Sequence, residues 1–202
     1  MITVGEARQY YLQADSAHGF DHVLRVLALA ERIARAEGAD LEIVRAAVLL
    51  HDVGREEEAQ TGRCHARIGA ERVREILRGY PPDKVEAVVE AIAAHRFRQG
   101  PSPQSLEAQV LYDADKLDAI GAIGVARAYA MAGHESRPLW GEPGENPSGG
   151  GAEHTPVHEF AFKLSRLKDS LFTATARQIA VERHRFMADF FQRLAEEVRG
   201  EC

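Results

Sequence analysis

Histidine and carboxylate side chains follow runs of apolar residues at several places in the sequence, and together they have the chemistry of a metal site. The clearest place is His51-Asp52, which comes directly after the apolar run 46–50. A carboxylate at the end of a core helix is costly to bury unless a charge compensates it, and a divalent cation does so directly. The alternative is a helix that ends in solvent, where His51 interacts with the helix dipole. The dipeptide alone leaves both interpretations open.

Two further histidines occupy comparable positions on neighbouring predicted helices. His22 lies four residues before Val26 and shares its inward face, and His18 would lie one turn earlier on the same side. His95 directly follows the segment 88–94, which is apolar except for Glu90. A single histidine at the position of His95 is more often a helix cap or a hydrogen-bonded core residue than a ligand.

A third kind of position is a cluster of carboxylates inside a predicted helix. Asp113, Asp115 and Asp118 fall within six residues of a segment otherwise rich in Leu, Ala, Ile and Gly. Leu111 and Ala119 lie four residues to either side of Asp115, which predicts an inward position for its carboxylate. Asp118 is one turn further on and can share that face. For Asp113 and Asp118, a solvent-exposed charged stripe explains the pattern as well.

Helical periodicity dominates the elements that must position these groups. Apolar residues recur at steps of three and four, whereas strand-like alternation and hairpin-turn dipeptides are missing from the sequence. Gly38 would end the first long helix and Asp40 would cap the next. The predicted helices span about 23–38, 41–53, 68–77, 85–92, 106–131 and 160–198. The sequence therefore predicts an all-α fold in a single domain.

The segment 134–158 interrupts this pattern with five glycines and four prolines among 25 residues. A loop this long inside a compact domain is either functional or disordered, so an active-site lid and a flexible insertion both fit. Trp140, the only tryptophan, lies in this segment and favours a lid that docks.

The composition excludes several classes of protein. The formal net charge of −6 argues against a nucleic-acid partner, although a locally positive pocket can still bind an anionic small molecule. Neither a targeting segment nor an apolar run near the length of a membrane span is visible, so we expect a cytoplasmic protein without a membrane partner. The two cysteines, Cys64 and Cys202, are too few and too far apart for a disulfide framework or a Cys-based zinc site.

The metal-site interpretation is stronger for these residues together than for each alone, because His22, His51-Asp52 and Asp115 follow one another on three separate predicted helices. This H…HD…D pattern resembles the HD-domain superfamily of metal-dependent phosphohydrolases. Longer segments resemble its bacterial YpgQ-like branch, namely HGFDHVLRV, LLHDVGR, AIAAHRF, DADKLDAIGAIGVARAYA and TARQIAVERHRFMADF.

The resemblance implies one HD-type helical bundle over residues 1–202. Its core would span about 18–130, the Gly/Pro-rich loop 134–158 would lie near the active site, and C-terminal helices would occupy 159–198.

The resemblance also implies a ligand set and a reaction. His22, His51, Asp52 and Asp115 would hold one divalent transition metal per chain, with manganese favoured and iron, cobalt, nickel or zinc as alternatives. The substrate would be a phosphorylated small molecule, most simply a nucleotide. The YpgQ-like branch is associated with splitting nucleoside triphosphates into monophosphate and pyrophosphate, here by a metal-activated water.

A polyphosphate needs several cations or donors besides the metal. Lys116 directly follows the implied ligand Asp115, and Arg25 lies three residues after His22, so these two are the first candidates for substrate contacts. Lys163 lies at the start of the helical segment after the loop, where a surface charge is an equally good explanation.

His95 has three candidate roles: a general acid, a phosphate donor, or a ligand of a second metal together with His18. We expect one metal, with Asp118 or His95 assisting the attacking water. Two other functions stay open. One is a nucleotide-binding regulator with weak catalysis, and the other is an HD-fold di-iron oxygenase, which would need His18 and His95 as extra ligands. A homodimer is compatible with the sequence.

One departure from related enzymes concerns the residues after the HD pair. Some HD-domain nucleotidases and hydrolases of guanosine polyphosphates carry a catalytic glutamate there, whereas Arg55 stands three residues after Asp52 in this chain. The following Glu56, Glu57 and Glu58 predict first a solvated turn. The sequence therefore speaks against a mechanism of those two types.

Overall fold

The computed structural model describes residues 1–11, 19–96, 101–143 and 154–202. Within these ranges every regular element is a helix, apart from an isolated bridge between Arg78 and Tyr80, so the all-α prediction is confirmed. The chain forms two compact units. The first contains Met1–Asp115 and Phe172–Ala176, and the second contains Lys116–Leu171 and Arg177–Cys202.

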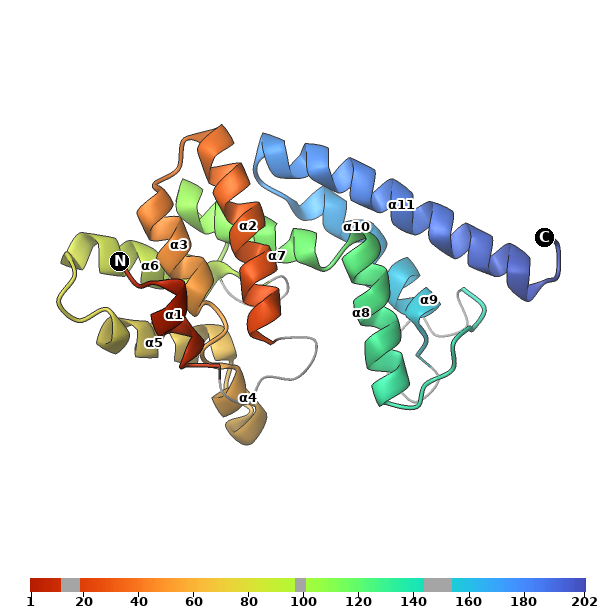
Figure 1. Cartoon of the computed structure of the whole chain (residues 1–202), viewed down its shortest axis with the longest axis horizontal. Coiled ribbons are helices and arrows are strands. Elements are labelled where there is room, and N and C mark those ends of the chain that lie inside the picture. The colour runs from red at the N-terminus through yellow and green to blue at the C-terminus, as the bar shows by residue number, and fades with distance from the viewer. Residues whose placement is uncertain (12–18, 97–100, 144–153) are drawn as a thin grey trace. The chain divides into compact units, whose positions relative to one another are not determined.

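Among the described residues, α1 to α7 and the first turn of α11 (Ala174–Val198) supply the helices of the first unit. The helices α2 and α3 pack together, as do α3 with α6 and α5 with α6 (Figure 1). Their apolar stripes form a buried core that includes Val26, Ile33, Val48, Ile68 and Ile92. The helices are α1 (Val4–Arg8), α2 (Phe20–Glu37), α3 (Leu41–Leu50), α4 (Arg55–Thr61), α5 (His65–Ile76), α6 (Pro82–Ala94) and α7 (Leu106–Asp118), the last continuing into the second unit.

The connection between α2 and α3 forms as its residues predict. Gly38 ends α2 with a φ of 82°, in the left-handed region that glycine adopts without strain. Asp40 caps α3, because its carboxylate accepts hydrogen bonds from the backbone N–H groups of Glu42 and Ile43. This local chemistry fixes where α3 begins, and its ten residues then carry the chain inward to His51.

The turn 51–54 lies against α5 without an intervening side chain, because position 54 is a glycine. Arg72 of α5 reinforces the contact by donating a hydrogen bond from Nη1 to the carbonyl oxygen of Val53, at 2.8 Å. The start of α5 is thereby held close to the end of α3.

The prediction of one helix over 106–131 is wrong. The structure has α7, which ends at Asp118, and a separate α8 (Gly121–His134). Ile120 is extended and Gly121 has a φ of 79°, a left-handed conformation that interrupts the helix. A Cβ on Gly121 would lie 3.0 Å from Cγ of Arg183, so a larger residue would also crowd α11 (Ala174–Val198).

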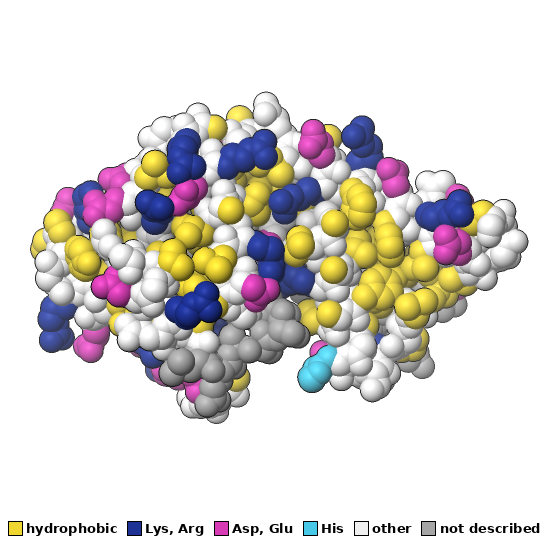
Figure 2. Space-filling model, viewed as in Figure 1, with side chains coloured by type: hydrophobic (Ala, Val, Ile, Leu, Met, Phe, Trp, Pro, Cys, Tyr) yellow, Lys and Arg dark blue, Asp and Glu magenta, His cyan; other side chains and the backbone are white. Residues whose placement is uncertain are grey.

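The second unit contains α8, most of α11 and short helical pieces between them. These pieces are α9 (Pro156–Glu159), the π-helical η1 (Phe160–Leu164), α10 (Ser165–Leu167) and the 3-10 turn η2 (Lys168–Ser170). Phe160 stacks on Phe191 with ring centroids 4.5 Å apart. Figure 2 shows hydrophobic side chains gathered along α8 and α11, and the exposed apolar residues of these helices include Ile123 and Phe186.

The Gly/Pro-rich segment is shorter as a loop than predicted, because α8 continues to His134 and α9 begins at Pro156. Trp140 is half-buried. Residues 144–153, which make up most of the predicted lid, lie outside the described residues, so the lid stays a prediction. No helix among the described ranges is long and apolar enough to cross a membrane.

Candidate metal centre

His51 and Asp52 are buried at the end of α3, where the sequence places them after an apolar run. Nδ1 of His51 lies 2.8 Å from the carbonyl oxygen of Val48 and donates to it, which leaves the Nε2 lone pair free to bind a ligand. Burial lowers the pKa of His51 to about 4, so its imidazole is neutral near pH 7. The interpretation of a helix end emerging into solvent is therefore wrong for this dipeptide.

Four side chains predicted as ligands converge in the first unit. Nε2 of His22 lies 3.9 Å from Oδ2 of Asp52 and 3.4 Å from Oδ1 of Asp115, and Nε2 of His51 lies 3.6 Å from Oδ2 of Asp52. The ligand atoms of His22, His51 and Asp52 all lie within 4.8 Å of one another. The structure thus brings together residues of α2, α3 and α7 that are far apart in the sequence.

The donor set fits a divalent cation. Among the described residues, neither Nε2 of His51 nor Oδ2 of Asp52 has a hydrogen-bond partner, although both atoms are buried. Buried polar atoms are normally paired, so two such atoms facing each other indicate a missing positive ligand. Imidazole nitrogens with carboxylate oxygens suit a transition metal better than Ca²⁺.

The other carboxylate oxygen of Asp52 faces a second group of histidines. Its Oδ1 lies 3.5 Å from Nε2 of His65 and 3.8 Å from Nε2 of His95. The two Nε2 atoms are 3.1 Å apart. Asp52, His65 and His95 are all buried and form a further set with metal-ligating spacing. Asp52 therefore takes part in both groups, one through each oxygen.

The ring orientations in this second group follow from what the Nδ1 atoms contact. Nδ1 of His95 lies 2.6 Å from the carbonyl oxygen of Ile92, and Nδ1 of His65 lies 2.7 Å from Oε2 of Glu58. Both contacts are to acceptors, so both Nδ1 atoms carry the proton. The two Nε2 lone pairs then face each other, and a proton or a cation between them would make the contact favourable.

The electrostatics of Asp52 depend on these neighbours. Burial raises the pKa of its carboxyl group, but the adjacent His51, His95 and Arg55 outweigh burial and hold the pKa well below its ordinary value. Arg55 contributes a direct hydrogen bond from Nε to Oδ1 of Asp52, at 2.9 Å. Asp52 is accordingly an anion throughout the neutral range.

Comparison with known proteins agrees with this geometry. A family model of the HD domain matches residues 19–120, a span that includes every residue of both groups. The chain belongs to the HD domain family. The HD domain implies a bound divalent metal, and both groups are positioned to hold one.

Two relatives illustrate the similarity. The HD-domain chain is 36% identical over 189 residues to the protein YpgQ of Bacillus subtilis, covering 92% of this chain and 86% of YpgQ. The crystal structure of Bacillus subtilis YpgQ in complex with ADP matches with a TM-score of 0.78 and 32% identity, over 98% of this chain and 99% of that one. A predicted HD-superfamily hydrolase from an uncultured Thermotogales bacterium matches with a TM-score of 0.70 and 32% identity, over 96% and 90% of the two chains. The HD-domain chain is thus a member of a superfamily of hydrolases.

Sequence reasoning missed two residues of this site. His65 received no role, although it lies three residues before the buried Ile68, at a spacing that places both on one face of α5. Glu58 was expected in a solvated turn, but it contacts His65, whereas Glu56 is exposed as expected. The sequence favoured one metal and offered His18 and His95 only as candidate ligands of a second. His18 lies outside the described residues, and the structure places His65 beside His95 instead.

Asp113 and Asp118 are buried, so the interpretation of a solvent-exposed stripe is wrong for both. Asp113 accepts hydrogen bonds from the backbone N–H groups of Phe172 and Thr173 and from the Thr173 hydroxyl, which ties α7 to the start of α11. Asp118 belongs to the second unit, where Nη1 of Arg127 lies 3.6 Å from its Oδ2.

The three residues predicted to contact phosphate lie in different parts of the structure. Arg25 lies one turn after His22 and donates to Asp21 at 2.6 Å. Lys116 and Lys163 belong to the second unit, where Lys163 donates to Glu159 at 2.8 Å. The roles predicted for these three residues stay predictions.

Proposed function

We propose that this HD-domain chain is a metal-dependent phosphohydrolase that splits nucleoside triphosphates into monophosphate and pyrophosphate. One observation carries the proposal: Nε2 of His51 and Oδ2 of Asp52 are buried, 3.6 Å apart and without hydrogen-bond partners among the described residues. Nε2 of His22 lies 3.9 Å from Oδ2 of Asp52, and Oδ1 of Asp115 lies 3.4 Å from Nε2 of His22, which supports a centre with four ligands. The ion that we propose for this centre is Mn²⁺, with Fe²⁺, Co²⁺, Ni²⁺ and Zn²⁺ as alternatives.

The chemistry that such an ion supplies is the polarisation of a phosphoryl oxygen and the acidification of a nearby water. The chain's own residues prepare the place for it. His51 stays neutral and keeps its lone pair directed inward because Val48 accepts its Nδ1 proton. Asp115 is the most accessible of the four side chains, with 17% of its surface exposed, so we take it as the ligand nearest to an incoming substrate.

Arg55 is our candidate for a phosphate contact in addition to Lys116 and Arg25. Its Nε is bound to Oδ1 of Asp52, yet 38% of its side chain remains exposed. A guanidinium that is anchored on one edge can still donate from its other edge to a phosphate oxygen. The nucleotide class of the substrate is supported by similarity to YpgQ, whose structure was solved in complex with ADP.

The group formed by Asp52, His65 and His95 favours a second candidate function, because it could accept another cation beside the first. A two-ion centre would suit either a dinuclear hydrolase or the di-iron oxygenase that remained open above. We propose the one-ion hydrolase, and metal content distinguishes these alternatives: two iron ions per chain with an oxidised-iron absorption band would support the oxygenase instead.

The decisive experiment is elemental analysis of the purified chain, followed by a nucleotide panel with Mn²⁺ in which both products are identified. Pyrophosphate with a nucleoside monophosphate is the expected result. Orthophosphate would show a phosphatase, and tight nucleotide binding without turnover would show a regulator. Either result would overturn the proposed reaction.

A further inference from the structure

Glu58 differs from the two glutamates that precede it. Glu56 is exposed, and Glu57 pairs with Arg63 at the surface, 3.1 Å from its Nη1. Glu58 instead receives two hydrogen bonds from His65, one from the backbone N–H at 3.2 Å and one from Nδ1 at 2.7 Å. Each carboxylate oxygen is used once, so Glu58 holds both the start of α5 and the ring of its first residue.

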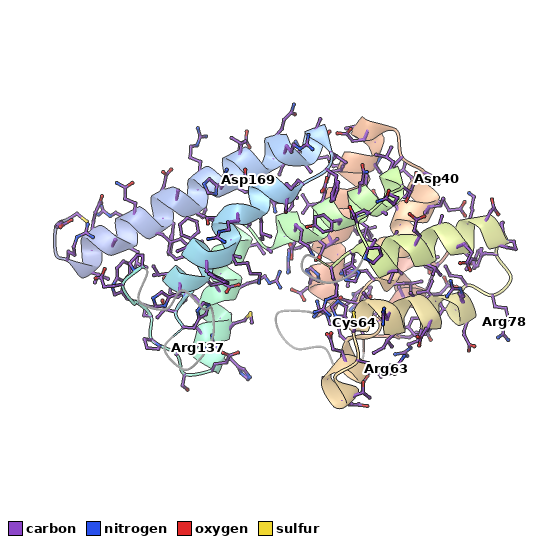
Figure 3. All side chains as sticks on the ribbon, turned by 180° about the vertical axis from the view of Figure 1, so that it is seen from behind. Asp40, Arg63, Cys64, Arg78, Arg137 and Asp169 are labelled. Atoms are coloured by element: carbon purple, nitrogen blue, oxygen red, sulfur yellow. The ribbon has the colours of Figure 1, made fainter. Side chains whose placement is uncertain are left out.

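Two arginines hold the Glu58 carboxylate in turn. Nη1 of Arg55 lies 3.6 Å from Oε2, and Nη1 of Arg96 lies 3.4 Å from Oε1. Arg96 also donates to Sγ of Cys64, the residue before α5 that is labelled in Figure 3. Glu58 is therefore clamped between α5 and two cationic side chains, which makes its position well defined.

The contact with Glu58 decides which nitrogen of His65 carries the proton. An ionised carboxylate only accepts hydrogen bonds, so Nδ1 of His65 must donate. In a neutral imidazole this leaves a lone pair on Nε2, which lies 3.5 Å from Oδ1 of Asp52 and 3.1 Å from Nε2 of His95. Three acceptors then converge. Arg55 already donates to Oδ1 of Asp52, so the two Nε2 lone pairs are the acceptors that need a proton donor or a cation.

The other tautomer of His65 would close this group. With the proton on Nε2, His65 could donate directly to His95 or to Asp52, and the buried acceptors would satisfy one another. Asp52 would then offer less negative charge to an ion at the proposed centre. We propose that Glu58 is a positioning residue, which keeps His65 in its Nδ1–H tautomer so that the side of Asp52 facing His65 stays open to an incoming ligand. The inference extends the proposed function, in that Asp52 is taken as part of the metal centre.

Imidazole tautomers can be read directly from long-range ¹⁵N–¹H NMR correlations of the full chain, with Zn²⁺ as a diamagnetic probe where metal is added. The NMR signals of the His65 ring are assigned as those that disappear from the spectrum of His65→Gln. In the metal-free wild-type chain we expect the proton of His65 on Nδ1. Glu58→Gln should keep the proton there, because the amide oxygen of glutamine can still accept a hydrogen bond from Nδ1. In Glu58→Ala we expect the proton to shift toward Nε2. Glu57→Ala, one residue away, is the matched control and should leave the spectrum unchanged.

The wild-type spectrum is sufficient by itself to overturn the inference, because a proton on Nε2 would contradict it even where Glu58→Ala did not fold. A folded Glu58→Ala chain that keeps the Nδ1–H tautomer would also overturn it. The second readout is Zn²⁺ affinity measured by competition with a chromophoric chelator, which should fall about 10- to 100-fold in Glu58→Ala and less in Glu58→Gln. Equal Zn²⁺ affinity of both variants and the wild type would contradict a positioning role for Glu58. A wild-type chain that binds no Zn²⁺ would instead contradict the proposed metal centre, and the tautomer measurement would still decide the role of Glu58.

Discussion

Gly54 and His65 are in direct backbone contact: a Cβ on Gly54 would lie 2.4 Å from the carbonyl oxygen of His65. The same Cβ would lie 3.0 Å from the backbone nitrogen of Gly69. The turn that carries Asp52 can therefore approach α5 only because position 54 lacks a side chain. This close approach brings His65 within reach of Asp52.

Gly54→Ala should therefore destabilise the fold and separate the two parts of the site. We expect a loss of about 1–3 kcal/mol in the free energy of unfolding, since the atoms in the way belong to the backbone and cannot rotate aside. Urea denaturation measures the change. Gly133→Ala is the control, because no atom lies within 4 Å of a Cβ there and alanine favours a helix. Equal stability of the two variants would contradict the packing described here.

Asp115→Ala should abolish metal binding and hydrolysis together while the helical circular dichroism survives. Its carboxylate is partly exposed and approaches His22, so its loss removes a proposed ligand without opening the core. We expect activity to fall about 100-fold or more, with a parallel loss of bound metal in elemental analysis. Asp169→Ala, at an exposed position, should change neither quantity. Full hydrolysis by the Asp115 variant would show that the centre is wrongly assigned.

Asp113→Ala should destabilise the fold but leave metal binding intact, although Asp113 is only two residues from Asp115. Its buried carboxylate accepts three hydrogen bonds from Phe172 and Thr173, so its removal leaves buried donors unpaired. We expect a loss of about 2–3 kcal/mol in the free energy of unfolding with metal content retained at low temperature. Thermal denaturation and elemental analysis of the same sample test both parts, and loss of metal from a folded variant would contradict the division of roles.

The metal-free chain should lose stability as the pH falls from about 6.5 to about 4. Burial lowers the pKa of both His51 and His65 to about 4 in the folded state, whereas an unfolded histidine titrates near 6.5. Between these values the unfolded chain binds more protons, so the free energy of unfolding decreases with decreasing pH, by up to about 1.4 kcal/mol per pH unit for each histidine.

Urea denaturation in the presence of a chelator measures this slope, and His65→Gln should reduce it because one of the two titrating groups is gone. A free energy of unfolding that does not change between pH 6.5 and 4.5 would show that neither histidine is held neutral by burial.

Arg55→Ala should weaken substrate binding more than it weakens metal binding. The exposed edge of its guanidinium is proposed to contact a phosphate, and hydrogen bonds between charged groups are each worth about 1.5–3 kcal/mol. We expect KM for a nucleoside triphosphate to rise about 10-fold or more. Arg63→Ala removes another arginine of the same region that pairs only with Glu57 and Glu71 in the contacts described, and its kinetics should match the wild type. An unchanged KM in the Arg55 variant would remove Arg55 from the substrate site.

The sequence was informative where a polar residue interrupts an apolar pattern. His22 and Asp115 stand on the inward side of a helix and His51-Asp52 directly follow an apolar helix, and the structure brings these four together. The residue type at position 40 predicted the cap of α3, and regular periodicity predicted the all-α class, because both depend on the local sequence.

The features that sequence reasoning missed depend on contacts between distant elements. His65 gains its surroundings only when α5 packs on the turn 51–54, and Glu58 is held by His65 and by two arginines, Arg55 and Arg96. The break at Gly121 has a different cause: its backbone adopts a positive φ, which the apolar spacing of 106–131 does not reveal.

Asp52 presents Oδ2 to His22 and His51 and Oδ1 to His65 and His95, although it has a single negative charge to share. Whatever binds at one oxygen must therefore change the free energy of binding at the other. By thermodynamic linkage this coupling is reciprocal, so a cation on either side of the carboxylate reports on the occupancy of the opposite side. One buried side chain thus makes two adjacent groups of ligands into a single thermodynamic unit.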